Sequence, residues 1–577
     1  MRNIILTLAL LGTTTCFGLS SRTSQASDKT ADTVYSNGRI YTANKESIWA
    51  QSIAVKGNKI TFIGDEAGVA NFVGKNTKVR QLNGRLVLPG LIDAHTHPGY
   101  IALTSKHLQL PEAKSKEKLF KSIENMVCSH PKRKVIIAMP WDNNLFDAQG
   151  PHKRILDKIE PNRPLLIWDS WMHSLWVNSK ALQLGGVDRT VKDPVPSFSF
   201  YQRDAEGELT GYITESAATE FWSSFESLTS QSEATLLDFL TYLRNQGVTT
   251  LFDAGNFGLD EAVYKVIQRL DRKGKLPVRY HGSYTLFLPQ DLQHSVATLK
   301  KMRSDFGSEK IKIDTLKVFL DGVIETRTAH MINDYLDTPG NRGNLLLSRE
   351  QLHALILELE KEGLHLHLHT VGNMATRTAL DAIEDTHKSL GRPPKIRIAI
   401  SHLEVMDSAD AARFKTLGAI AQFTPHWHGG DDSHSYDKSI GALRDKMFLT
   451  KSLVSEGAMV TFSSDAYFTS DWEAGNASPF TGIQVGHNRQ YVEDGPDGPV
   501  AAPVSEALSR QLMVDGYTRN GAYQLGIENE LGSLETGKKA DFIVLDKNLF
   551  EVDRYAIHKL KPSAVILDGK LVHGSLD

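Results

Sequence analysis

Two histidines spaced two residues apart form the first candidate site for chemistry. His95 and His97 lie near the end of the run Leu-Pro-Gly-Leu-Ile-Asp-Ala-His-Thr-His-Pro at residues 88–98. On a β-strand, residues with this spacing point to the same side and lie about 6 to 7 Å apart at the backbone. Two imidazoles can then bind one cation. A single histidine is more often a hydrogen-bonded structural residue, but this pair at the end of an apolar run predicts a metal site.

Further histidines and an aspartate close later apolar runs. They are His369, His402 and Asp465. The carboxyl ends of barrel strands share one face, where active sites of such barrels form. His365, His367 and His369 alternate onto one side of their run, and at most one or two can reach a metal. We favour His369, which is last, and interpret His365 and His367 as structural.

A lysine lies inside another apolar run. Lys317 occurs in Leu-Lys-Val-Phe-Leu-Asp-Gly at residues 316–322, where an unpaired ammonium group would be costly to bury. Two interpretations remain open at this point. Lys317 either forms a salt bridge, for example with Asp321, or reacts with carbon dioxide to give a carbamate, an anionic ligand that can bridge two divalent ions.

The elements that must position these residues follow from the pattern of residues 89–530. Apolar runs alternate there with amphipathic stretches, which indicates βα units and a parallel sheet. The candidate strands are residues 91–95, 165–169, 249–254, 278–284, 315–321, 364–369, 398–402, 419–423 and 459–464. An eight-stranded (β/α)8 TIM-like barrel needs one fewer, so we expect an early candidate to lie outside the barrel.

The barrel region is also longer than the roughly 250 residues typical of this fold. We assign the excess to an insertion at about residues 100–230, over the barrel mouth. Within it, residues 201–213 resemble a β-hairpin.

Both ends of the chain have a different sequence pattern from the barrel region. Short alternating runs joined by Asn-Gly and Gly-Asn turns fill residues 32–88, and similar runs return at residues 540–572. We therefore predict one small β-domain built from residues 27–88 and 531–577.

The first 26 residues have the three-part pattern of a secretory signal peptide. Arg2 precedes a mainly apolar run at residues 4–19, and Ser24-Gln25-Ala26 gives a small-x-small cleavage site. The run is shorter than the roughly 20 residues of a spanning helix, and we expect no stable membrane insertion. The sequence before Cys16 is a poor match to a lipoprotein signal. We predict a periplasmic or secreted protein, with a lipid anchor as the less favoured alternative.

Composition excludes some partners. The 577 residues include 65 Lys and Arg against 68 Asp and Glu, a net charge of -3. This balance provides no basic surface for a polyanion, which argues against nucleic acid. We expect a small-molecule substrate, and a homo-oligomer stays open.

Six motifs in this order resemble the amidohydrolase superfamily, specifically the branch that includes N-substituted formamide deformylases. They occupy residues 89–97, 173–182, 247–255, 317–329, 464–465 and 532–541. The resemblance implies a distorted (β/α)8 barrel with a composite β-sandwich. It assigns the metal centre, with one or two divalent ions, zinc being favoured, to His95, His97, Lys317, His369, His402 and Asp465.

Three segments depart from the family pattern. Asn373 replaces a common Asp, Val-Ile-Glu at residues 323–325 replaces a smaller segment, and Ala466-Tyr467 replaces Ala/Ser-Pro. They put the substrate in doubt more than metal binding.

The resulting prediction is a metal-dependent hydrolase that cleaves amide or formamide-type carbon-nitrogen bonds with a metal-bound hydroxide. Asp465 would be the catalytic proton acceptor. The alternatives are a lactonase or esterase, a deaminase, or a non-catalytic secreted binding protein. A deaminase usually needs a Glu near His369, and the nearest candidate, Glu404, follows His402 instead.

Three residues are candidates for substrate contact: His173, Arg327 and Trp427. His173 has a packing or hydrogen-bonding role as its alternative. Arg327 and Arg444 serve equally well as ordinary salt-bridge partners, and Trp427 serves equally well as a cover on the barrel rim.

Overall fold

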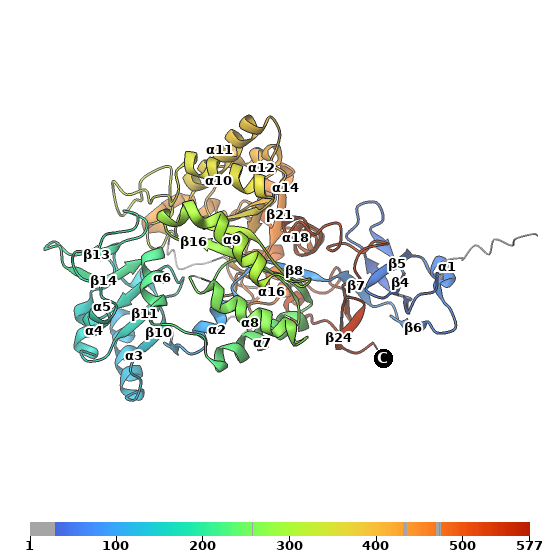
Figure 1. Cartoon of the computed structure of the whole chain (residues 1–577), viewed down its shortest axis with the longest axis horizontal. Helices are drawn as coiled ribbons and strands as arrows, with labels where there is room; N and C mark the ends of the chain where they lie inside the picture. The colour runs from blue at the N-terminus through green and yellow to red at the C-terminus, as the bar shows by residue number, and fades with distance from the viewer. Residues whose placement is uncertain (1–28, 257, 431–435, 469–471, 473–474, 577) are drawn as a thin grey trace, which may run out of the picture.

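The computed structural model describes residues 29–576 except 257, 431–435, 469–471 and 473–474 (Figure 1). The signal peptide predicted at residues 1–26, with Cys16, lies outside the described residues, so export stays a prediction. In the part of the chain that is described, no helix is long and apolar enough to cross a membrane.

An eight-stranded parallel sheet forms the centre of the molecule. Its strands follow chain order, with each strand beside the next one. They are β8 (Leu91–Thr96), β15 (Val248–Asp253), β16 (Arg279–Leu286), β17 (Ile311–Phe319), β18 (His365–Thr370), β19 (Ile398–His402), β20 (Ile420–Phe423) and β21 (Met459–Phe462). This confirms the predicted α/β barrel. The ninth candidate, residues 165–169, lies in another sheet, as expected for one early run.

The first and last strands of the barrel meet through the segment that follows β21. The backbone N–H of Asp465 donates to the carbonyl of His95 at 2.9 Å, and the N–H of His97 donates to Ala466 at 3.0 Å. These two bonds close the ring of strands at its carboxyl end. They also place Asp465 directly beside the two histidines.

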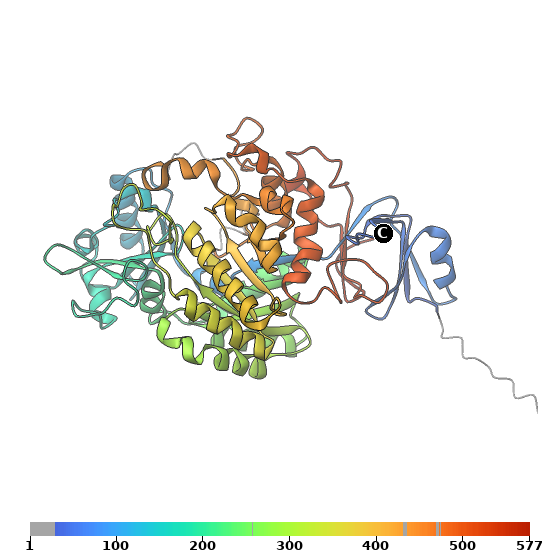
Figure 2. The same ribbon diagram turned by 90° about the horizontal axis from the view of Figure 1, so that it is seen from above.

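Helices cover the outside of the barrel between successive strands (Figure 2). The longer ones are α7 (Ser230–Asn245), α8 (Asp260–Arg272), α9 (Leu292–Phe306), α10 (Arg349–Glu362) and α11 (Asn373–Leu390), and α16 (Pro479–Asn488) follows the last strand. Helix α10 shows why such elements have sharp ends. Ser348 and Gln351 form a capping box at its start, and Gly363 ends it with a left-handed φ of 64°.

The segment between β8 and α7 forms a sheet of its own, at the left of Figure 1. It contains β9 (Leu108–Gln109), β10 (Ile136–Trp141), β11 (Leu165–Asp169), β12 (Ser174–Val177), β13 (Tyr201–Arg203) and β14 (Leu209–Thr214), and it is flanked by α2 (Pro98–Thr104), α3 (Lys116–Ser129), α4 (Lys153–Ile159), α5 (Ser179–Leu184) and α6 (Glu215–Ser223). Strands β13 and β14 are antiparallel neighbours, which confirms the predicted hairpin.

Two further sheets lie at the opposite end of the molecule (Figure 1). One has the order β5-β4-β1-β6 and the other β24-β23-β22-β7-β2-β3. Their strands are β1 (Thr33–Ser36), β2 (Arg39–Tyr41), β3 (Trp49–Ala50), β4 (Ser52–Lys56), β5 (Lys59–Gly64), β6 (Lys78–Gln81), β7 (Leu86–Pro89), β22 (Phe542–Leu545), β23 (Ala564–Leu567) and β24 (Lys570–Gly574).

The sheet with the order β24-β23-β22-β7-β2-β3 joins the two ends of the chain, because β22 pairs with β7. Tyr35 and Phe542 pack edge to face in the apolar core below it, with ring centroids 4.9 Å apart. Strands from both termini therefore share one sheet. The description of this region as a composite β-sandwich, and the boundaries at residues 88 and 531, stay predictions.

A buried ion cluster links the barrel to this sheet. Arg279, the first residue of β16, forms ion pairs with Asp541 and Asp568. The Arg279 and Asp541 side chains are buried.

We expect Arg279→Leu to lower the free energy of unfolding by about 3–5 kcal/mol, because it leaves the Asp541 carboxylate buried without its cation. The urea midpoint of unfolding would measure the loss. Arg349→Leu is the matched control: Arg349 also pairs with two carboxylates, Asp381 and Asp385, but its side chain is 40% exposed, so the loss should stay below about 1 kcal/mol. Equal midpoints for the two variants would show that the cluster is not stabilising.

Candidate metal centre

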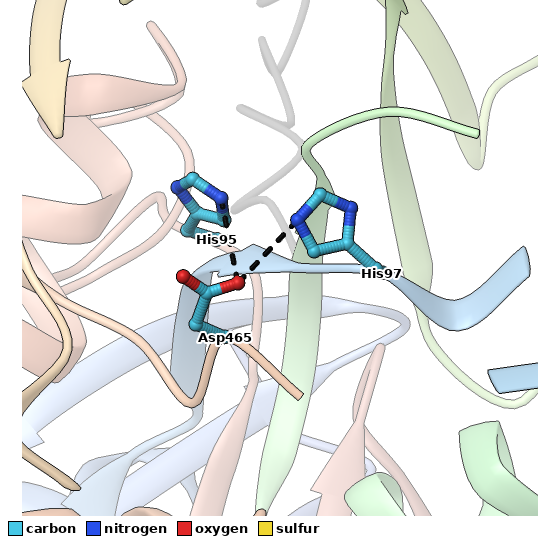
Figure 3. Close-up of side chains that lie close together, drawn as sticks. All are labelled: His95, His97 and Asp465. Carbon is cyan, nitrogen blue, oxygen red and sulfur yellow. Dashed lines mark ion pairs between the residues drawn. The ribbon is translucent and has the colours of Figure 1, made fainter. Parts of the chain in front are cut away.

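His95 and His97 lie at the end of β8, and both side chains are buried in the barrel mouth (Figure 3). The Nδ1 of His97 is 3.0 Å from the carbonyl oxygen of Gly255. A carbonyl only accepts, so this Nδ1 carries the ring proton and the lone pair is on Nε2. The contact fixes the ring of His97 in the form that can bind a metal.

The ring of His95 is fixed in the same way. Its Nδ1 is 3.0 Å from the Oε1 of Gln422. The amide nitrogen of Gln422 donates to Ser463 Oγ at 2.7 Å and to the Phe423 carbonyl at 2.8 Å, so its oxygen faces His95. The ring proton of His95 is therefore on Nδ1, and the lone pair on Nε2 is directed into the site.

Asp465 faces the Nε2 atoms of both histidines (Figure 3). Its Oδ1 is 3.6 Å from His95 Nε2 and 3.4 Å from His97 Nε2, and the three ligand atoms lie within 4.8 Å of one another. Asp465 has a left-handed φ of 46°, which a non-glycine residue rarely adopts. The preceding Ser464 donates from its N–H and its hydroxyl to Asp93 on β8, at 3.0 and 2.6 Å, and this holds the turn.

His369 and His402 complete the ring of histidines. Their ring centroids are 4.3 Å apart, and His402 Nδ1 is 3.5 Å from Asp465 Oδ2. Burial lowers the pKa of both well below 6.5, so both are neutral, as ligands must be. His402 has a left-handed φ of 74°, a strained conformation of the kind found at functional sites.

Lys317 on β17 lies within the same group of side chains and is fully buried. Its Nζ is 3.5 Å from His95 Nε2, and no carboxylate of the described residues lies within 4 Å of it. Burial lowers its pKa from 10.5 to about 7. Asp321 instead accepts three backbone N–H bonds, from His330, Val371 and Gly372. The salt-bridge interpretation is therefore wrong for Asp321.

His365 and His367 lie nearer the amino end of β18 than His369 does. The Nδ1 of His365 accepts from the N–H of Arg397 at 3.2 Å, which is a structural contact. His367 Nε2 is 2.9 Å from His95 Nδ1, on the side of that ring away from Asp465. Of these three histidines only His369 lines the cavity above the site.

That cavity has a volume of about 50 Å³. All six candidate metal ligands line this cavity, together with His173 and Trp427. Its other walls are Tyr100, Trp171, Met172, Phe319, Val323, Glu325, Glu404 and Tyr467.

His173 enters this cavity from the inserted sheet. Its Nδ1 is 2.6 Å from the Oε2 of Glu215, and Glu215 also accepts from Thr328 Oγ1 at 2.6 Å. Burial lowers the pKa of His173, but the carboxylates of Glu215, Asp169 and Glu325 together raise it more, and the net pKa is raised. The structure therefore gives His173 the hydrogen bond of its alternative role and places it on the cavity wall, while its contact with a substrate stays a prediction.

Trp427 and Arg327 differ in position. The Trp427 ring stacks on His402, with centroids 5.6 Å apart and planes 15° apart. Arg327 does not line the cavity. Its guanidinium pairs with Asp337, with Nε 3.2 Å from the carboxylate, which is the salt bridge that was its alternative role. A substrate contact by Arg327 stays a prediction.

Comparison with known proteins decides the family. The model of the amidohydrolase family matches residues 78–573. The chain belongs to the amidohydrolase family.

Relatives of this amidohydrolase carry varied names. It is 28% identical over 533 residues to the protein Long After Far-Red 3 of Arabidopsis thaliana, covering 90% of this chain and 88% of that protein. It is 25% identical over 566 residues to an N-substituted formamide deformylase of Arthrobacter pascens, covering 94% and 98%. An uncharacterized metal-dependent hydrolase of Pyrococcus horikoshii OT3 shares the fold, with a TM-score of 0.65 at 23% identity, covering 90% and 99%.

Membership of the amidohydrolase family supports a hydrolase of small molecules and implies a divalent metal ion. The residues of the amidohydrolase fit such an ion. Both ring nitrogens of the buried His402 lack a hydrogen-bond partner within the described structure, and the Nε2 lone pairs of His95 and His97 converge on Asp465. Neutral imidazoles and a carboxylate are the ligand set that suits zinc and similar ions.

Glu325 and Glu404 are the acidic cavity residues that sequence reasoning did not assign to the site. Burial raises the pKa of both carboxyls. The sequence did give one indication for Glu404, which is its position two residues after His402, the last residue of β19.

Proposed function

We propose that this amidohydrolase cleaves the carbon-nitrogen bond of a small amide or formamide, with zinc as its metal. The observation that carries the proposal is the position of Asp465, which faces both metal-binding nitrogens and lines the cavity. A relative named N-substituted formamide deformylase supports the choice of bond.

His95, His97 and Asp465 would hold the metal, with His369, His402 and Lys317 completing the site or holding a second ion. When bound, a divalent ion lowers the pKa of a water and polarises a carbonyl oxygen.

Asp465 would move the proton. Its carboxylate accepts a proton from the attacking water while the new carbon-oxygen bond forms, and then delivers that proton to the substrate nitrogen as the carbon-nitrogen bond breaks. The backbone N–H bond from Asp465 to His95 and the contacts between Ser464 and Asp93 hold the carboxylate in place for both steps. The His173 ring, oriented by Glu215, would contact the substrate at the opposite wall.

Lys317 would carry the carbamate. Carbon dioxide adds only to a neutral amine, and burial supplies one near neutral pH by lowering the pKa of Lys317 to about 7. The nitrogen would lose a proton as the carbamate forms, and the carbamate would replace a buried neutral amine with an anionic ligand beside His95.

A substrate panel tests the function. Amides, formamides and lactones would be offered to purified protein stripped of metal and then reloaded with zinc. We expect turnover of amides or formamides that depends on the metal. Turnover of lactones alone would replace the proposed carbon-nitrogen chemistry with ester chemistry, and no turnover at all would favour a binding protein.

The proposed location is the periplasm or the exterior. We expect the mature chain to begin near Ser27, because residues 1–26 meet the requirements of an export signal. N-terminal sequencing of protein from fractionated native cells checks this. An intact Met1 on a cytosolic species would contradict it.

A further inference from the structure

A second cavity adjoins the metal cavity and is larger, about 360 Å³ against 50 Å³. The two share Trp171, Glu404 and Trp427, which therefore form a neck between them. Aromatic and apolar groups line much of the remaining wall, among them Tyr436, Met447, Phe448 and Tyr491. The second cavity therefore lies next to the space in which a molecule would react at the metal.

Glu404 is the acidic group at the neck. The residue is only 8% exposed, yet no hydrogen bond or ion pair to its carboxylate occurs among the residues that the structure describes. The charged groups that act on it are other acids, namely Glu325, Asp321 and Asp465. Burying a carboxylate without a partner costs free energy. A bound group that brings positive charge or N–H donors would offset that cost.

The neighbouring carboxylates already have partners. Glu325 accepts from the Tyr436 hydroxyl at 2.7 Å, and Asp321 accepts its three backbone N–H bonds. Asp445, on the wall of the second cavity, lies 3.4 Å from the guanidinium of Arg444. Glu404 is therefore distinguished from these acids by an unused hydrogen-bonding capacity at the point where the two cavities meet.

The two tryptophans add a second feature suited to a cation. Trp171 and Trp427 are perpendicular, with ring centroids 6.4 Å apart. Tryptophan faces attract an ammonium group that lies within about 6 Å of the ring. A carboxylate combined with aromatic rings is a recognition site for organic ammonium ions.

We propose that the neck formed by Trp171, Glu404 and Trp427 binds the amine that hydrolysis releases, with the N-substituent in the second cavity. This assignment rests on the proposed carbon-nitrogen hydrolysis. That reaction converts amide and water to a carboxylic acid and an amine. The acid then loses a proton and the amine gains one, which gives a carboxylate and an ammonium ion. Ester hydrolysis would release an uncharged alcohol, for which the Glu404 carboxylate offers no charge pairing.

A pair of probes of equal shape tests the neck. Binding of cyclohexylammonium chloride and of cyclohexanol would be measured by calorimetry at pH 7 on zinc-loaded wild type, Glu404→Gln and the control Glu530→Gln. We expect wild type to bind the ammonium at least about tenfold more tightly than the alcohol. Glu404→Gln should lose that preference and keep its zinc and its affinity for cyclohexanol. Glu530→Gln should behave as wild type, because its carboxylate is 57% exposed, lies 3.2 Å from the Lys539 ammonium and lines neither cavity.

Three results would overturn the assignment. They are undiminished ammonium binding by Glu404→Gln, loss of zinc from that variant, which would make Glu404 a metal ligand, and equal affinity of wild type for the two probes. The outcome is separable from the proposed reaction. Ammonium binding that depends on Glu404 in a protein inactive toward amides would refute the reaction alone, whereas amide turnover without such binding would refute the neck alone.

Discussion

Replacing Asp465 by Asn is expected to lower kcat by about 10²- to 10⁴-fold while most of the metal stays bound. The loss follows because an amide neither accepts the proton of the attacking water nor delivers one to the leaving nitrogen. Metal stays because His95 and His97 keep their Nε2 lone pairs, which the contacts to Gln422 and Gly255 hold toward the site. Rate and zinc content would be measured on the same sample.

Asp546→Asn serves as the control for this substitution, since it makes the same chemical change at a carboxylate that is 68% exposed. Its kcat should match wild type. Near wild-type turnover by Asp465→Asn would show that another group accepts the proton, and Glu404 would be the first to examine. Loss of both zinc and activity would mean that Asp465 is needed mainly as a ligand.

Lys317→Ala is expected to lose both zinc and activity. Its Nζ lies 3.5 Å from His95 Nε2 within a group of histidines, and as a carbamate it would supply oxygens to one or two ions. Alanine removes that ligand. A short carboxylic acid, or bicarbonate with a short amine, should restore part of the metal content and part of the rate by occupying the vacated space.

Lys312→Ala is the matched control, because Lys312 lies on the same strand with its side chain exposed. It should keep wild-type zinc and activity. Electron density of the native protein would show the carbamate directly. An unmodified Lys317 in a fully active preparation would refute the carbamate and leave a site built from His95, His97, Asp465 and the later histidines.

The barrel and the position of the candidate site could be predicted from the sequence because both depend on local pattern. Apolar runs mark the strands, and a polar residue at the carboxyl end of a parallel strand must face the same mouth as its counterparts. That reasoning placed His95, His402 and Asp465 together from segments that are far apart in the chain.

Partner choice among side chains could not be predicted in this way. Arg327 suits a substrate anion or a salt bridge equally well until the position of Asp337 is known. Lys317 and Asp321 lie four residues apart, but the carboxylate of Asp321 is turned to backbone N–H groups of another loop. Glu404 gave no sequence signal beyond its position, since its importance lies in the absence of a described partner.

The segment that closes the barrel, which follows β21 and carries Asp465, makes the candidate metal site depend on synthesis and folding of almost the whole barrel. His95 and Asp465 are joined only when the segment after the last strand reaches the first strand, so a chain arrested before residue 459 would carry His95 and His97 without the carboxylate that faces them. Zinc added during refolding would therefore bind selectively to molecules with a closed ring and draw the population toward them. The time at which the protein begins to bind metal tightly would then report when β8 and the segment after β21 have come together.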